Sequence, residues 1–206
     1  MPFCLFVSCD SGDPAAARRA LSGARAAERL LVHAPAAARD PFLGGGDRAP
    51  ALVVQAYFAG LDELQAALPA LQESLPLPAS CEAMAVRRFA VPQPGAGGCS
   101  YLVRYAGPAD DPAAWHAHYL EHHAPLMAAL PGIRELEVYL PLDWDAPAGP
   151  WRAVRSLQRN KVAFDGPGAL EAALASPVRA KMRADFAAFP AYRGEVSHLP
   201  MLSFEP

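Results

Sequence analysis

One order of predicted elements occurs twice along the chain, and this repeat restricts the fold more than any other feature. Apolar, strand-forming segments and alanine- and leucine-rich helical segments follow each other as strand, helix, strand, strand, helix, strand over residues 4–91 and again over residues 101–204. A Pro/Gly-rich stretch at 92–98 separates the two series. Two short matches support a duplication: residues 13–16 and 111–114 both read Asp-Pro-Ala-Ala, and 63–68 resembles 169–174.

The repeated order βαββαβ is that of a ferredoxin-like unit. We therefore predict an α+β protein of two tandem ferredoxin-like modules, residues 1–93 and 99–206. Each Asp-Pro pair predicts a helix start, with Asp as the N-cap and Pro in the first turn. The expected helices begin at Asp13 and cover 62–74, 111–130 and 169–186, with a break at Pro177. A run of glycines at 44–46 predicts a flexible connection.

Charge, cysteine spacing and the first residues exclude several classes of protein. The 18 basic and 21 acidic residues give a net charge of −3, so the chain lacks the excess of positive charge that binds nucleic acid. Asp10 interrupts the short apolar run near the start, and no basic segment precedes that run, so we expect no signal peptide, no membrane partner and a cytoplasmic location. The four cysteines form no CxxC pair, which predicts reduced, mostly buried thiols.

Four of the six histidines lie in residues 115–126, within the expected helix 111–130. At about 100° per residue, His123 and His116 fall near the middle of a broad apolar face, His122 lies at its edge and His118 points away from it. The residues that form this face are Trp115, Tyr119, Leu120, Leu126, Met127 and Leu130.

A histidine on an inward face suits proton transfer because its ordinary pKa of about 6.5 lies close to neutral pH. The structural alternative is a core histidine that only satisfies a carbonyl or Tyr119. A metal site is a second alternative, because His118 to His122 matches the H-x-x-E-H pattern of some zinc peptidases. On a helical wheel of this segment, His118 lies on the side away from the apolar face, so we predict no metal.

Polar residues on two expected strands share a face with apolar neighbours. Strict alternation places Gln158 and Asn160 on one face of strand 156–164, and His198 on the apolar face of strand 196–204. Such groups line a pocket, or else they lie at a sheet edge or an interface.

The run Trp115 to Leu126, followed by Leu-Pro-Gly-Ile at 130–133, resembles the signature of the EthD (ethyl tert-butyl ether degradation) family of the dimeric α/β-barrel superfamily. The family histidine corresponds to His123 and the aromatic hydroxyl position to Tyr119. The resemblance covers 101–204, and in the first half it is architectural only. It implies that two ferredoxin-like sheets pack into an α/β barrel with helices outside. The duplication suggests that one chain supplies both modules, although a homodimer remains compatible with it.

The resemblance and the histidine helix together predict a small-molecule enzyme that acts on a cyclic or aromatic carbonyl compound, as an isomerase, decarboxylase, dehydratase or cofactor-free oxygenase. We expect no metal and no tightly held cofactor. The alternative is a non-catalytic accessory protein that binds an apolar metabolite for an oxygenase system. The expected catalytic residues are His123, Tyr119 and His116, and the expected substrate contacts are Trp115, Gln158, Asn160 and His198.

Overall fold

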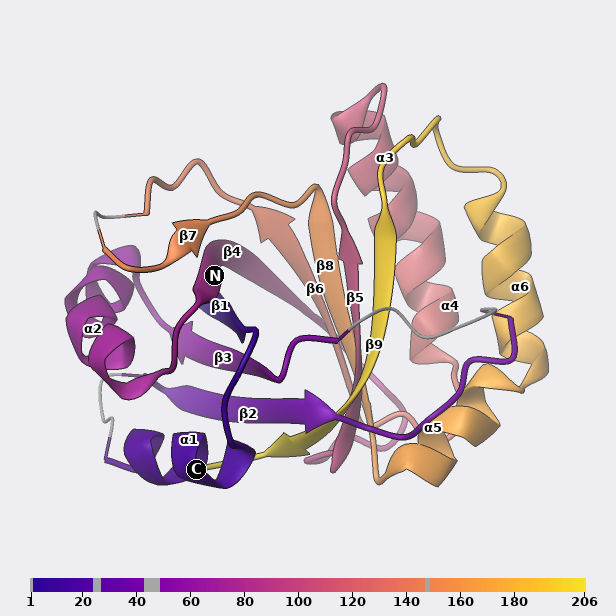
Figure 1. Cartoon of the computed structure of the whole chain (residues 1–206). Coiled ribbons are helices and arrows are strands. Elements are labelled where there is room, and N and C mark those ends of the chain that lie inside the picture. The colour runs from indigo at the N-terminus through magenta and orange to yellow at the C-terminus, as the bar shows by residue number, and fades with distance from the viewer. Residues whose placement is uncertain (1, 24–26, 43–48, 147–148) are drawn as a thin grey trace.

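The computed structural model describes residues 2–23, 27–42, 49–146 and 149–206, and it confirms the repeated element order (Figure 1). The first half comprises β1 (Phe3–Cys9), α1 (Pro14–Leu21), β2 (Arg29–Pro35), β3 (Leu52–Phe58), α2 (Leu61–Ser74) and β4 (Ala79–Phe89). The second half comprises β5 (Cys99–Tyr105), α3 (Pro112–His118), the π-helical turn η1 (Tyr119–His123), α4 (Ala124–Ala128), β6 (Glu135–Pro141), β7 (Arg152–Ala153), β8 (Gln158–Phe164), α5 (Pro167–Leu174), α6 (Pro177–Phe186) and β9 (Val196–Phe204). The glycines at 44–46 lie outside the described residues.

The two Asp-Pro pairs cap helices as predicted. The Asp13 carboxylate accepts hydrogen bonds from the backbone N–H groups of Ala15 and Ala16, and Asp111 accepts one from Ala114. A proline follows each cap in the first turn, where no N–H is needed. The predicted break at Pro177 is also confirmed, because α5 ends at Leu174 and α6 begins at that proline.

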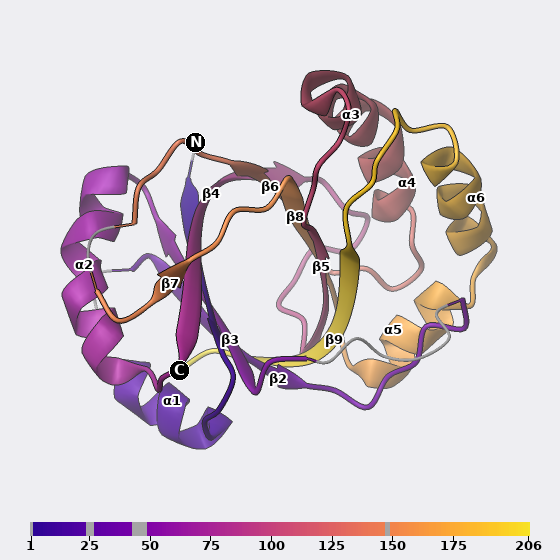
Figure 2. The ribbon, with the colours of Figure 1, turned by 45° about the horizontal axis from the view of Figure 1, so that its top comes forward.

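Eight antiparallel strands close into one barrel. The first half contributes the order β4-β1-β3-β2 and the second half the equivalent order β9-β5-β8-β6. Pairing of β2 with β9 and of β4 with β6 joins the two sheets edge to edge, and β7 pairs with β4 outside the ring. The predicted α/β barrel of two ferredoxin-like modules is therefore confirmed, and one chain closes it (Figure 2).

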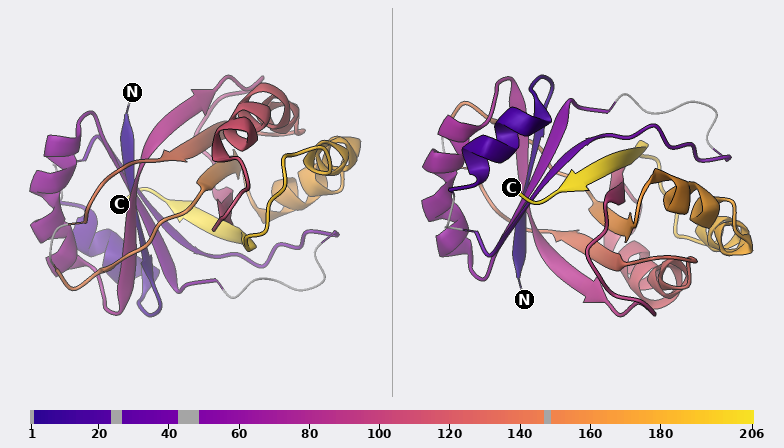
Figure 3. Two further views of the ribbon diagram at one scale, coloured as in Figure 1. Left: turned by 90° about the horizontal axis from the view of Figure 1, so that it is seen from above. Right: turned by 90° about the horizontal axis from the view of Figure 1, so that it is seen from below.

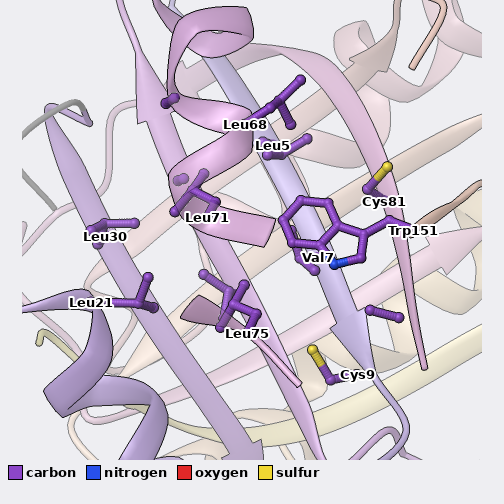
Figure 4. Packing of buried hydrophobic residues seen from close by; sticks show 14 of the residues in the cluster. Leu5, Val7, Cys9, Leu21, Leu30, Leu68, Leu71, Leu75, Cys81 and Trp151 are labelled. Carbon is purple, nitrogen blue, oxygen red and sulfur yellow. The ribbon is translucent and has the colours of Figure 1, made fainter. Parts of the chain in front are cut away.

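Helices cover the outside of the barrel on two opposite sides. Helices α1 and α2 pack on the first-half sheet, and α3 to α6 pack on the second-half sheet (Figure 3). The space under α2 is filled by leucines, among them Leu68, Leu71 and Leu75, together with the indole of Trp151 (Figure 4). This filled core lies where the second half has a cavity.

Each half covers its neighbour with a loop. The first-half loop, residues 36–42, runs from the end of β2 to α5 and α6, where Ala36 and Ala38 pack on the second-half core (Figure 1). The second-half loop, residues 142–146 and 149–151, packs Trp144 and Trp151 against the first-half core. The two halves therefore complete each other's helix-covered faces.

Charged side chains occupy the barrel interior. Lys161 of β8 is fully buried, and its Nζ lies 2.9 Å from Oε2 of both Glu135 and Glu137 on β6. Glu137 Oε2 also accepts hydrogen bonds of 2.6 Å from the hydroxyls of Tyr57 and Tyr139. Because Tyr57 belongs to β3, this network links the two halves inside the barrel.

Three further features of the described residues concern the cysteines, the helix lengths and the grouping of metal-ligating side chains. All four cysteines are free and buried, as predicted. None of the described helices has the length and apolar character needed to cross a membrane. No group of three or more His, Cys, Asp or Glu side chains within the described ranges is placed to hold a metal ion.

Candidate functional site

The histidine helix is not a regular α-helix, and its irregular turn positions His123. Residues Trp115, Tyr119, His123 and Met127 are all buried, at intervals of four. On a regular α-helix each such interval turns the side chain about 40° further round the axis. The π-helical turn η1, closed by a hydrogen bond from Ala124 N–H to Tyr119 O, absorbs this drift. Single π turns of this kind are frequent at functional sites.

Asp185 of α6 orients the buried ring of His123. Nδ1 of His123 lies 2.8 Å from Asp185 Oδ2. An ionised carboxylate only accepts hydrogen bonds, so Nδ1 carries the proton and Nε2 of the neutral ring keeps its lone pair. Burial lowers the pKa of His123 below its usual 6.5, and the hydrogen bond to Asp185 opposes this without reversing it. The ring is therefore neutral at pH 7.

His123 lines two adjoining cavities between the outer face of the second-half sheet and its helices. The inner one measures about 40 Å³ and the outer one about 350 Å³. Both include Tyr105, Arg179 and His198 in their walls. The remaining walls are mainly apolar, and include Val103, Met127, Leu130, Val162, Leu174, Met182, Phe186 and Val196. An apolar cavity with a few convergent polar groups is typical of a small-molecule site.

Arg179 brings a positive charge to this cavity, and the first-half loop holds it. Its Nη2 donates a 2.9 Å hydrogen bond to Asp40 Oδ2, which also accepts one of 2.8 Å from the Tyr101 hydroxyl. Burial alone would raise the pKa of Asp40, but hydrogen bonds from Phe42 N–H, Arg179 and Tyr101 lower it. The buried Nε of Arg179 has no acceptor among the described residues. Its guanidinium therefore retains a donor.

Of the predicted substrate contacts, Asn160 and His198 line the inner cavity, as does His123. Trp115 and Gln158 are fully buried and are not among the described residues that line either cavity. Trp115 packs in an aromatic cluster with Tyr105, 5.0 Å between ring centroids.

The other two predicted catalytic residues lie outside the cavity walls. The Tyr119 hydroxyl donates to Met127 Sδ at 3.3 Å and accepts a short hydrogen bond from Asn160. Burial raises the pKa of Tyr119 well above 10, so it stays protonated. His116 Nε2 lies 2.9 Å from the carbonyl oxygen of Leu157, which ties the helix to the segment just before β8.

The helical wheel turns His118 away from the apolar face, but in the structure its ring contacts the same carboxylate as His123. Nε2 of His118 lies 3.0 Å from Asp185 Oδ1, so Asp185 bridges His118 and His123. The π turn and the position of α6 cause the difference, since neither follows from a regular wheel. His122 is exposed.

Asp185 and Arg179 are the functional candidates that the sequence did not identify. Both lie on α6, and they meet His123 only through tertiary packing. The available signal was weak: a carboxylate and an arginine within an amphipathic helix are usually solvated.

Comparison with known proteins shows the fold. No protein-family model matches the chain, and no curated protein matches it. A "putative monooxygenase" from Lactobacillus acidophilus has a structure that matches with a TM-score of 0.60 at 9% identity, over 98% of this chain and 93% of that one. An anthrone oxidase-like protein matches with a TM-score of 0.55 at 13% identity, over 99% and 92% of the two chains. The chain thus has the fold of the dimeric α/β-barrel superfamily.

The more specific EthD relationship stays a prediction. An EthD family protein from Bacillus halodurans aligns with 48% of this chain and 95% of its own at 20% identity, with a TM-score of 0.35. The cytoplasmic location, the homodimer and the division into units 1–93 and 99–206 also stay predictions.

Proposed function

We propose that the His123 cavity is the active site of an enzyme that moves a proton on a cyclic or aromatic carbonyl compound. The observation that carries the proposal is the buried His123–Asp185 pair, whose neutral ring lines an apolar cavity beside Arg179. A carboxylate that fixes one imidazole nitrogen makes the other a directed base.

In the proposed step, Nε2 of His123 takes a proton from the carbon next to the substrate carbonyl. The C–H electron pair forms the new C=C bond, and the carbonyl π pair moves to oxygen as an enolate. Asp185 stabilises the imidazolium that results, and Arg179 stabilises the enolate oxygen. Return of the proton to another atom completes an isomerisation, whereas loss of a β-hydroxyl as water completes a dehydration. Neither route needs an external oxidant.

Asn160 and His198 are proposed to contact the substrate, because both line the cavity. Tyr119 is proposed to act through Asn160, which its hydroxyl fixes from behind, and not by touching the substrate. The names of two structural neighbours, a monooxygenase and an anthrone oxidase-like protein, support aromatic ketones as the compounds to test first.

The test measures, by NMR, the exchange for deuterium of the C–H protons next to the carbonyl in a panel of aromatic ketones that carry such protons. We expect the protein to accelerate exchange, and His123→Gln to reduce the acceleration by about 10²- to 10⁴-fold. His122→Gln is the matched control on the same turn, because that side chain is exposed, and we expect no change.

Two results would overturn this function. Equal exchange rates for wild type and His123→Gln would show that His123 is not the base. Binding of a panel member without any accelerated exchange would favour the alternative, a non-catalytic protein that carries an apolar metabolite for an oxygenase system.

A further inference from the structure

A second and larger cavity opens at one end of the barrel, on the opposite side of the sheet from His123. It measures about 530 Å³ and lies among the ends of β1, β4, β5, β8 and β9. Alternation along the strands separates the two sites. On β5, Tyr105 faces the His123 cavity and Arg104 faces the barrel, and on β9, His198 and Ser197 divide in the same way.

Arginines dominate the charge of this barrel-mouth cavity. Arg104, Arg152 and Arg159 line it, whereas Asp10 is the one carboxylate among its described lining residues. Arg104 and Arg159 lie directly opposite each other on the paired strands β5 and β8. Like charges at directly opposed positions destabilise a sheet unless a counter-charge compensates them.

Only Arg159 of this opposed pair has a carboxylate partner within the described residues. Its Nε lies 2.8 Å from Glu82 Oε2, and Glu82 is further occupied by the backbone N–H and hydroxyl of Ser156. Arg104 donates Nε to the Ser156 hydroxyl at 2.7 Å and Nη2 to the backbone carbonyl of Arg155 at 3.5 Å, and none of the described carboxylates pairs with it. Burial, together with the positive charge of Arg159, lowers the pKa of Arg104. A half-buried guanidinium is therefore held in place at the cavity with N–H groups to spare.

Three serines surround the arginines. Ser197 lies opposite Arg104 on β9, and Ser8 lies opposite Ser80 on β1 and β4. All three line the cavity. Guanidinium and hydroxyl donors that converge in this way match the oxygens of a carboxylate or a phosphate.

The remaining wall is apolar and the space exceeds that of an inorganic ion. Leu199, Val154, Ala49 and Pro50 supply this wall. We propose that the barrel mouth binds a small organic anion, with its carboxylate or phosphate group on Arg104 and Ser197 and its apolar body against Leu199. This site is independent of the proposed activity at His123.

The test is calorimetric titration of the full chain with phenyl phosphate, benzoate and the uncharged benzyl alcohol. We expect one site that takes an anion and rejects the alcohol. Tighter binding of phenyl phosphate would identify a phosphate ester as the ligand class, and tighter binding of benzoate an organic acid. Replacing Arg104 with Gln removes a charge-assisted contact, so we expect binding to weaken about 10- to 100-fold.

Three further variants keep the result interpretable. Arg104→Lys keeps the charge and loses the planar fork, so we expect intermediate binding. Arg155→Gln is the control, because that exposed side chain pairs with Asp143 and Asp145 outside this cavity and should bind as wild type does. Arg179→Gln removes the cation of the His123 cavity. Loss of anion binding in Arg179→Gln, or unchanged binding in Arg104→Gln, would overturn the proposal.

Discussion

Replacing Lys161 with Met is expected to lower the free energy of unfolding by about 3 to 5 kcal/mol at pH 7. The Nζ it removes is fully buried and lies 2.9 Å from both Glu135 and Glu137. Glu137 is fully buried as well, and would keep Arg88 as its remaining cation among the described residues. A buried carboxylate that loses its partner retains its desolvation cost without the compensating attraction.

The pH dependence separates this electrostatic effect from simple loss of packing. Burial alone would raise the pKa of Glu137, but Lys161 and the hydroxyls of Tyr139 and Tyr57 lower it from 4.5 to about 2. That difference corresponds to about 3 kcal/mol of stability, present above pH 4.5 and lost as the pH falls towards 2. Without Lys161 the pKa of Glu137 rises. The variant therefore lacks this contribution already at neutral pH and has none to lose in acid. The deficit of Lys161→Met should therefore be largest at neutral pH and shrink below pH 4.5.

Urea denaturation followed by circular dichroism at several pH values measures this. Lys181→Met is the matched control, since the only other lysine of the chain is exposed and its loss should change stability by less than about 0.5 kcal/mol. A Lys161→Met variant that unfolds within about 1 kcal/mol of wild type at pH 7 would refute the reasoning. A deficit that stays constant from neutral pH to pH 3 would assign the loss to packing instead.

Three other predictions concern the site and the joining of the halves. For the exchange reaction, kcat/KM should be constant at and above neutral pH and fall in acid as His123 gains a proton, and Asp185→Asn should move that fall to lower pH because Asp185 raises the pKa of His123. Trp151→Ala should cost about 3 to 5 kcal/mol in urea denaturation, because its indole fills the core under α2. A protease site inserted between the exposed Pro94 and Gly95 should give two fragments that still elute together from a sizing column, since the β2–β9 and β4–β6 pairings stay intact after cleavage.

Local chemistry made most of the fold predictable. The Asp-Pro caps at 13 and 111, the break at Pro177 and the strand from Leu52 to Phe58 depend on neighbours in sequence, and the structure has each of them. Closure of the barrel followed from the family resemblance and not from any local pattern. Strand pairing between the halves is a long-range property that residues near a strand do not specify.

The site was predictable only in part, because a helical wheel assumes a regular helix. It directed His123 inward correctly, but it also directed His116 inward, and that ring bonds to the carbonyl of Leu157, just before β8. The sequence gives one indication of charges inside the barrel. On strand 158–164 the face opposite Asn160 carries Arg159 and Lys161. Two cations on a buried strand require buried partners, but only the fold identifies Glu82 and Glu137 as those partners.

The exchange of loops between the halves has a consequence for how such a protein can change. In a barrel made from two copies of one module, a tryptophan that fills one helix-covered space must fill the other too. In the single chain, residues 36–42 and the segment around Trp151 mutate separately, so one side can serve as solid support while the other keeps a cavity. A chain adapting to a new ligand could therefore acquire its first changes at Asp40 or Phe42, in the half that lacks the histidine helix.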